Sequence, residues 1–153
     1  MNLLDNKIAI QWYLVPAIAI SILLLICAVS FAEEIDMTVI AQIESSGNPL
    51  AHNISEDGRG LYQINPICLK EWNNYHPKKQ YTKEELFDAE INTIIAVWYM
   101  NVRIPQMIRY YKKPVTTENI IIAFNAGIAY VAYNYEIPSS TKKYIEKYNR
   151  LKK

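Results

Sequence analysis

The chain has 153 residues, and its 16 Lys and Arg nearly balance its 15 Asp and Glu, so it lacks the excess of positive charge that nucleic-acid-binding proteins carry. The chain has only two Cys and two His, which is too few to indicate a disulfide framework, a structural zinc site or a catalytic metal. Its length allows one small domain with a hydrophobic core. Twelve Tyr and three Trp are many for this length, and exposed aromatic faces stack on sugar rings.

An almost wholly apolar segment, 14–32, stands near the start of the chain and is long enough to cross a bilayer as a helix. Lys7 precedes it, and the acidic residues Glu33, Glu34 and Asp36 follow it. Because positive charge favours the cytoplasmic side, we expect the rest of the chain to be exported to the periplasm or cell envelope.

Two interpretations of this N-terminal segment stay open. The small-x-small pattern that ends at Ala32 is typical of a signal-peptidase site and gives a mature start near Glu33. The length of the apolar run, and an aromatic pair at 12–13 that resembles an interfacial belt, favour an uncleaved anchor held in the inner membrane. Residues 1–32 are therefore a signal peptide or a membrane anchor, and 33–153 form the exported domain.

The first helix of the domain is expected at 36–45, with Asp36 as its N-cap and apolar positions at 37, 40 and 43. Glu44 lies in its last turn, next to the apolar face and ahead of the breakers Gly47 and Pro49. The negative end of the helix dipole and the loss of hydration both raise the pKa of such a carboxyl, which suits a general acid. The alternative is an ordinary exposed helix residue.

A polar, turn-rich loop is expected at 48–59, followed by a short extended piece at 60–66. Gly60 permits close approach of the backbone in that piece. Asn65 and Pro66 are predicted to begin a helix that runs to about Trp72.

Two further helices follow from capping signals. A capping box at 82–85 predicts a long helix whose inner face carries Leu86, Ile91, Ile94, Ile95 and Trp98. Pro105 is expected to end or kink that helix. Residues 116–118 begin an apolar helix that reaches Asn125 and stops at Gly127.

The last predicted helix is capped by residues 138–141 and carries Tyr144, Ile145 and Tyr148. It ends in a basic tail, which is either a solvated helix end or a surface that attracts polyanions of the envelope. No long run of alternating strand residues appears. We therefore predict a mainly α-helical domain.

Four short motifs occur in an order that resembles the lysozyme-like lytic transglycosylases of the soluble (SLT) type. They are Glu-Ser at 44–45, Gly-Leu-Tyr-Gln-Ile at 60–64, Ala-Phe-Asn-Ala-Gly at 123–127 and Thr-Lys-Lys-Tyr at 141–144. The resemblance spans about 35–148. It implies a goose-lysozyme-like helical fold, a peptidoglycan substrate, no cofactor, and cleavage of the β-1,4 bond between N-acetylmuramic acid and N-acetylglucosamine that leaves a 1,6-anhydro end.

The resemblance also implies roles for individual residues. Glu44 is the catalytic acid and base, Gln63 lines the sugar cleft, Asn125 lies near the N-acetyl group, and Tyr144 lies close to Glu44. A structural role is the alternative for the last three: Gln63 ties down its turn, Asn125 caps its helix end, and Tyr144 packs against the core. The family commonly has Met at Tyr62 and Tyr at Phe124, and its loop serine falls at Asn53 or Ser55, which leaves open which of the two contacts substrate. The predicted substrate-binding residues are Ser45, Asn53, Ser55, Tyr62, Gln63, Asn125 and Tyr144.

The number of carboxylates separates the possible reactions. A usual glycosidase needs two, and the second would have to come from Glu56 or Asp57, where turn chemistry is the commoner role. A transglycosylase needs one, because the substrate's N-acetyl group stabilises the positive centre and its C6 hydroxyl replaces water. Glu44 would protonate the leaving oxygen and then accept the proton of that hydroxyl.

Two alternative functions remain: a hydrolytic muramidase, and a catalytically silent peptidoglycan-binding assembly factor. The expected partner is a peptidoglycan strand, with the membrane added if the N-terminal segment is uncleaved. Small exported enzymes that the chain resembles open the wall for secretion, conjugation or pilus machines, and phage use them for entry. The sequence does not choose among these settings.

Overall fold

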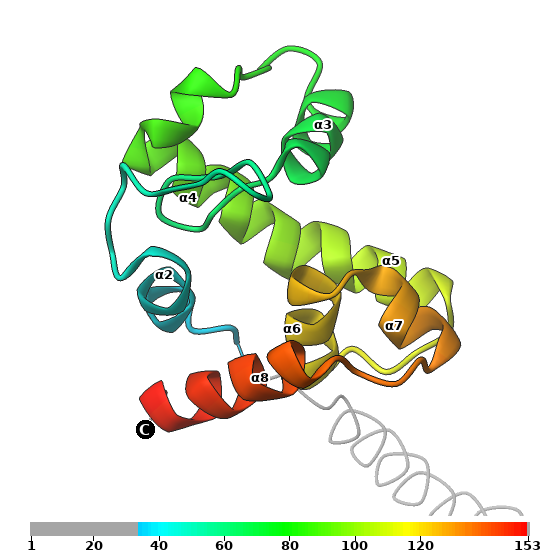
Figure 1. Ribbon diagram of the computed structural model, residues 1–153. Helices are drawn as coiled ribbons and strands as arrows, with labels where there is room; N and C mark the ends of the chain where they lie inside the picture. Colours follow the sequence, from blue (N-terminus) through cyan, green and yellow to red (C-terminus); the bar gives the residue numbers. More distant parts are fainter. Residues whose placement is uncertain (1–33, 153) are drawn as a thin grey trace, which may run out of the picture. The chain divides into compact units, whose positions relative to one another are not determined.

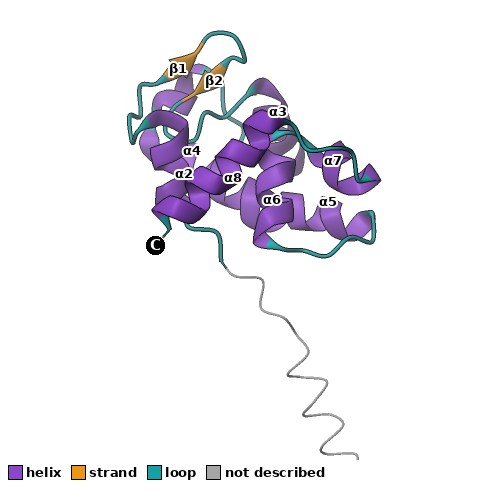
Figure 2. Ribbon diagram, turned by 60° about the horizontal axis from the view of Figure 1, so that its bottom comes forward, coloured by secondary structure: helices purple, strands orange, loops and turns teal. Residues whose placement is uncertain are grey.

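The computed structural model describes residues 34–152, all of which belong to one unit, Glu33–Lys153. Helices dominate this part of the chain, which confirms the mainly α-helical prediction (Figures 1 and 2). No helix among residues 34–152 is long and apolar enough to cross a membrane, and the predicted segment 14–32 lies outside the described residues. The elements are α2 (Met37–Ser45), β1 (His52–Asn53), β2 (Gly58–Arg59), α3 (Pro66–Tyr75), η1 (Glu84–Phe87), α4 (Ala89–Trp98), η2 (Tyr99–Arg103), α5 (Ile104–Tyr110), α6 (Thr117–Asn125), α7 (Ile128–Tyr133) and α8 (Ser139–Leu151).

The core is built around a central helical run made of α4, η2 and α5 (Figure 1). Ile95, Met100, Ile104 and Ile108 of this run are fully buried. Burial of each such side chain stabilises the fold by about 1.5–3 kcal/mol. α6 packs on α5, and α8 packs on both α2 and α6. The helix that carries Glu44 is thus fixed to the core through α8.

Pro105 does not end the central run, contrary to one of the two outcomes expected for it. The chain passes from α4 through the π-helical turn η2, in which the N–H of Ile104 bonds the carbonyl of Tyr99, and continues as α5. Proline cannot donate an N–H into the helix, and it is tolerated in a first turn. The wider turn just before Pro105 lets the helical run continue past it.

The capping box forms, but it begins a shorter element than predicted. The N–H and hydroxyl of Thr82 donate to the Glu85 carboxylate at 2.8 and 2.9 Å. This turn is the 3₁₀ helix η1, and α4 begins separately, with the Asp88 carboxylate accepting from the N–H groups of Glu90 and Ile91. A second N-cap, Asp88, six residues after Thr82, breaks the predicted single helix in two.

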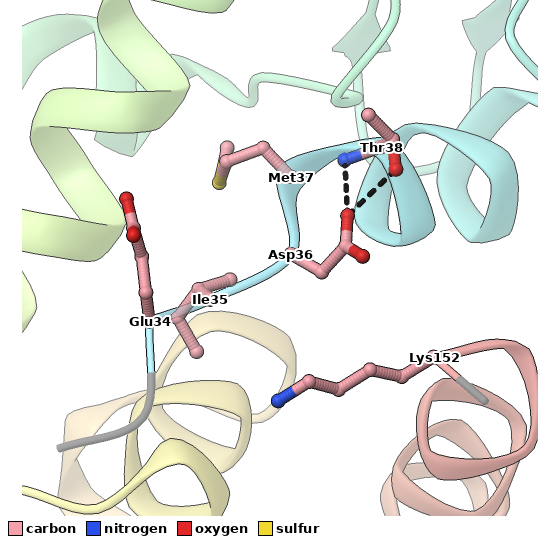
Figure 3. A pocket seen from close by; sticks show the side chains of 6 residues that line it. All are labelled: Glu34, Ile35, Asp36, Met37, Thr38 and Lys152. Carbon is pink, nitrogen blue, oxygen red and sulfur yellow. Dashed lines mark hydrogen bonds between the residues drawn. The ribbon is translucent and has the colours of Figure 1, made fainter.

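The start of α2 agrees with the sequence prediction. The Asp36 carboxylate accepts hydrogen bonds from the N–H and hydroxyl of Thr38 at 3.0 and 2.6 Å (Figure 3). The N–H of Asp36 donates to the hydroxyl of Tyr148 on α8 at 2.9 Å. Lys152 is half-buried, with its ammonium 5.8 Å from the centre of the Tyr148 ring. One cation of the predicted basic tail therefore packs against the domain.

The segment 60–66 is mostly a turn, not the extended piece expected from the sequence. β1 and β2 pair antiparallel, and Arg59 then pairs with Ile64 by two backbone hydrogen bonds, so residues 60–63 reverse the chain. We call residues 52–64 the hairpin. Gly60 has a φ of +76°, and a Cβ there would collide with the Leu86 carbonyl and the Asn92 amide. Only glycine fits this close approach, as predicted.

The C-terminal helices differ from the prediction in two places. α6 ends at Asn125 before Gly127, as expected, but α7 follows at once and was missed, because its six residues carry no capping signal. α8 begins at Ser139 without any side-chain cap. Thr141, predicted as part of that cap, is a buried residue inside the helix.

Candidate active site

A cleft of about 380 Å³ opens where the end of α2 faces the hairpin, the start of α3 and the end of α6. Glu44 lines it from α2, Asn53 and Gln63 from the hairpin, and Asn125 from α6. Glu44, Gln63 and Asn125 come from three separate motifs, and Asn53 comes from the loop between the first two. The fold therefore brings to one cleft side chains that lie up to 81 positions apart in the chain, from Glu44 to Asn125.

Glu44 is the carboxylate of this cleft that has lost most of its contact with water. Burial among its neighbours raises the pKa of Glu44, and the negative charge of Glu56 acts in the same direction. A hydrogen bond from Tyr144 and the charge of Lys147 lower the pKa of Glu44 in part. The net shift is upward, which keeps the proton on the carboxyl to higher pH than in an exposed glutamate.

Tyr144 supports Glu44 from α8. Its hydroxyl donates to Oε1 of Glu44 at 2.7 Å, as the predicted proximity required. Burial and the nearby Glu44 carboxylate raise the pKa of Tyr144, so it remains a hydrogen-bond donor throughout the working pH range. The contact fixes one oxygen of the Glu44 carboxyl group.

One helical turn earlier, Thr141 supports the opposite side of the cleft. Its hydroxyl donates to Oδ1 of Asn125 at 2.7 Å. Because the amide oxygen of Asn125 accepts this bond, its NH₂ group is the part oriented for donation to a ligand. α8 therefore holds two site residues, Glu44 and Asn125, through side chains three positions apart.

The hairpin wall is held by the side chain of Gln63. Its NH₂ group donates to the carbonyls of Gly60 and Ala51 at 2.8 and 3.2 Å, and its Oε1 accepts from the N–H of Asn53 at 3.1 Å. Gln63 has a φ of +49°, and this backbone strain is offset by the three bonds. Gln63 both ties down its turn and lines the cleft, so the two roles weighed for it are compatible.

Four predicted substrate-binding residues, Tyr144 and three others, lie outside the cleft lining. The Ser45 hydroxyl donates to the Leu61 carbonyl at 2.8 Å and so fastens the end of α2 to the hairpin turn. The Ser55 hydroxyl donates to Oδ1 of Asn53 at 2.7 Å. Tyr62 is only 5% exposed and packs in the core. Of the two loop candidates, Asn53 lines the cleft, and the substrate contacts predicted for all seven residues stay predictions.

Asn92 is a functional support that the sequence interpretation missed. It is fully buried on α4, its Oδ1 accepts from the N–H of Tyr62 at 2.9 Å, and its NH₂ donates to the carbonyls of Arg59 and Leu86 at 2.8 Å. The sequence does contain a signal for this role, because the polar residue Asn92 interrupts the predicted inner face of the helix one turn before Ile95. Asn92 anchors the hairpin wall to the central helical run.

Glu56 and Asp57 are adjacent in the chain but lie in different surroundings. Glu56 lines the cleft with Glu44. Asp57 is bound by Lys83 at 2.5 Å, Arg59 at 2.9 Å and His52 at 3.3 Å, which lower the pKa of Asp57 far below its usual value. The role of Asp57 is therefore to hold the hairpin, and Glu56 is the second carboxylate of the cleft.

Among residues 34–152, no group of three or more His, Cys, Asp or Glu side chains is placed to hold a metal ion. Cys68 lines the cleft as a buried free thiol, and burial strongly raises its pKa, so it remains protonated.

Comparison with known proteins gives one positive finding. The family model described as the transglycosylase SLT domain matches residues 32–153. The matched range contains all four motifs and every residue placed at the cleft. No curated protein and no solved structure gives a match.

Proposed function

The chain belongs to the transglycosylase SLT family, a family of peptidoglycan lytic transglycosylases, and from this premise we propose that it cleaves peptidoglycan without consuming water. The substrate bond is the β-1,4 link between N-acetylmuramic acid and N-acetylglucosamine. The product carries a 1,6-anhydromuramic end. Glu44 is the catalytic residue.

The reaction needs one carboxyl group that acts twice. Protonated Glu44 gives its proton to the bridging oxygen as the bond from that oxygen to muramic C1 breaks. The N-acetyl oxygen stabilises the positive charge at C1, with the Asn125 amide beside it. The C6 hydroxyl oxygen then bonds C1, and its proton returns to Glu44, so the enzyme ends in its starting state.

The observation that carries this proposal is the setting of Glu44. Its carboxyl faces the cleft, its pKa is raised by burial, and Tyr144 holds one of its oxygens at 2.7 Å. A general acid needs a pKa near the working pH and a fixed direction of approach. Both conditions are supplied by helices, which hold side chains more rigidly than loops.

A hydrolytic muramidase is the second candidate, and Glu56 is the observation that favours it. Glu56 lines the same cleft and is close enough to Glu44 for its charge to raise the pKa of Glu44. A second carboxylate can activate water in glycoside hydrolysis. Glu56 is exposed, however, and no hydrogen bond among the described residues fixes its carboxylate.

Product analysis separates the two reactions. Purified cell-wall sacculi are digested with the full-length protein in mild detergent, and the soluble fragments are analysed by mass spectrometry. Anhydromuramic ends, each one water lighter than a reducing end, are expected. Reducing ends would identify a muramidase, and binding to sacculi without any soluble fragment would identify a silent binding protein.

We also propose that the domain acts outside the cytoplasm, in the periplasm or cell envelope. The apolar segment 14–32 and the acidic residues after it support this direction of export. The physiological role that we propose is local wall opening or remodelling, as in the small exported enzymes that the chain resembles. Protease added to spheroplasts should digest the domain. Complete protection of the domain would contradict the proposed direction of export.

A further inference from the structure

Two of the elements that line the cleft, α3 and η2, also line a second hollow, of about 480 Å³, together with α5 and the start of α7. α3 contributes Ile67 to the cleft and Tyr75 to the hollow. The chain after α6 contributes Gly127 to the cleft and the next residue, Ile128, to the hollow. Figure 1 shows α3 and α7 beside the helical run that contains α5. We call the second hollow the tyrosine chamber, after Tyr75, Tyr110 and Tyr111 that line it.

An ion pair marks the junction between the cleft and the tyrosine chamber. Nε of Arg103 on η2 donates to the carboxylate of Glu71 on α3. Glu71 stands one turn from Cys68 of the cleft and one turn from Tyr75 of the chamber. Because residues three or four apart share one face of a helix, the ion pair lies between the two hollows on α3.

Tyrosine rings and a few polar groups make up the chamber. Tyr75 is 52% exposed and Tyr110 81% exposed, and the Tyr110 and Tyr111 rings meet edge to face with centres 5.2 Å apart. The guanidinium of Arg103 lies 4.7 Å from the centre of the Tyr75 ring, which orders that ring. Met107 adds an apolar surface. Such a group of exposed aromatic side chains marks a binding site more often than a single exposed ring does.

We propose that the tyrosine chamber binds further sugar units of the peptidoglycan strand whose scissile bond lies at Glu44. This inference rests on the proposed function, because it takes the same polymer as ligand. Sugar rings present C–H faces that stack on tyrosine, while Arg103 and Gln106 offer hydrogen-bond donors to hydroxyl and N-acetyl groups. The volume of the chamber falls in the range of small-ligand pockets.

Continuity and charge both favour a strand over another occupant. Gly127, which lines the cleft, is followed directly in the chain by Ile128, which lines the chamber, so the two hollows adjoin the same stretch of chain. Arg109 and Lys112 are exposed and adjoin Tyr110 and Tyr111 in the chain. Peptidoglycan stems carry carboxylates, which these cations complement. The chamber therefore adds contacts to the strand and makes long strands the preferred ligands.

The test compares ligands of two lengths. In the full chain with Glu44→Gln, which keeps strands intact, affinity is measured for long glycan strands that carry their stem peptides and for a tetrasaccharide. Tyr110→Ala and Tyr75→Ala should each lower the ratio of long-strand to tetrasaccharide affinity by about five- to tenfold, a usual size for an aromatic anchor. Tyr110→Phe should keep the ratio, because it keeps the ring.

Tyr135→Ala is the matched control, since Tyr135 is 56% exposed but does not line the chamber. A ratio that falls no more in the chamber variants than in this control would overturn the proposal. Altered self-association in sedimentation, with strand binding unchanged, would instead assign the chamber to a second copy of the chain. If the wild type cut no strand while the chamber variants still lowered the ratio of long-strand to tetrasaccharide affinity, the result would overturn the proposed function but leave the chamber as a strand-binding site.

Discussion

The end of α2 and the hairpin each present an acidic side chain, and the two sites change the pKa in opposite directions. Glu44 on α2 is half-buried and has one hydroxyl donor, and its pKa is raised. Asp57 on the hairpin lies among three basic side chains, and its pKa is lowered. Loss of water dominates the first site, and paired charges dominate the second. One carboxyl is set up to carry a proton, and the other to hold a loop.

The largest expected effect is that of Glu44→Gln, which removes the proposed proton donor and keeps its shape. Cleavage of sacculi should fall by about a thousandfold or more, within the usual range for loss of a general acid. Release of soluble fragments measures it, and unchanged helical circular dichroism controls for folding. Substantial residual turnover would remove Glu44 from the mechanism.

The same variant has a stability consequence whose sign follows from the raised pKa. Glu44 binds its proton more tightly in the folded state than in the unfolded state. The fold therefore loses stability as the pH rises from the unfolded-state pKa of Glu44 towards its folded-state pKa. Glutamine carries no such cost. Glu44→Gln should therefore be stabilising at neutral pH and less so in acid, and thermal melts at several pH values would measure this.

Asn92→Ala tests the hairpin side of the comparison. It leaves the N–H of Tyr62 and the carbonyls of Arg59 and Leu86 without their buried partner. We expect a loss of about 3 kcal/mol in the free energy of unfolding, together with weakened activity, because each unsatisfied buried group costs about 1–3 kcal/mol. Urea unfolding measures it. Asn119→Ala, which removes an exposed bond to Pro114, is the control and should cost far less.

The sequence predicted the parts of the site that depend on local signals. The N-cap at Asp36, the turn glycine Gly60 and the end of α6 before Gly127 each follow from the conformational needs of one residue. The proximity of Glu44 and Tyr144 came from motif resemblance, since 100 positions separate them. Local pattern carries no information about contacts at that distance.

The supports of the site were not predicted, for a physical reason. Thr141 was interpreted as a helix cap and Asn92 was not singled out, yet both are buried and bind groups distant in the chain. A polar residue on the inner face of a helix needs a hydrogen-bond partner from elsewhere in the fold, but the local sequence does not show which residue that partner is. The split of the predicted long helix at Asp88 arises similarly, from two capping signals in competition.

Two substitutions should move the pH dependence of the enzyme in opposite directions. Tyr144→Phe removes a hydrogen bond that favours the ionised Glu44, so the pKa of Glu44 should rise and the alkaline limb of kcat/KM should shift to higher pH. Glu56→Gln removes a neighbouring negative charge, so the limb should shift to lower pH. Profiles of kcat/KM on soluble strands measure both. If both variants shifted the limb in the same direction, or did not shift it, the alkaline limb of kcat/KM would report the pKa of a group other than Glu44.

The smallest expected effect is that of Asp57→Asn on the stability of the hairpin. The pKa of Asp57 lies far below its unfolded value of 3.8, so its ion pairs stabilise the fold above that value and lose their effect as the pH falls towards the folded pKa. Lys83 and Arg59 are partly solvated partners, and salt screens such pairs. The variant should melt slightly below the wild type at neutral pH and low salt, and the difference should shrink in strong acid and in high salt. Glu146→Gln on α8, an exposed carboxylate away from the hairpin, is the control and should show neither dependence. A difference that persisted in high salt would mean that Asp57 acts through the turn it occupies, where its φ is +52°, and not through its charge.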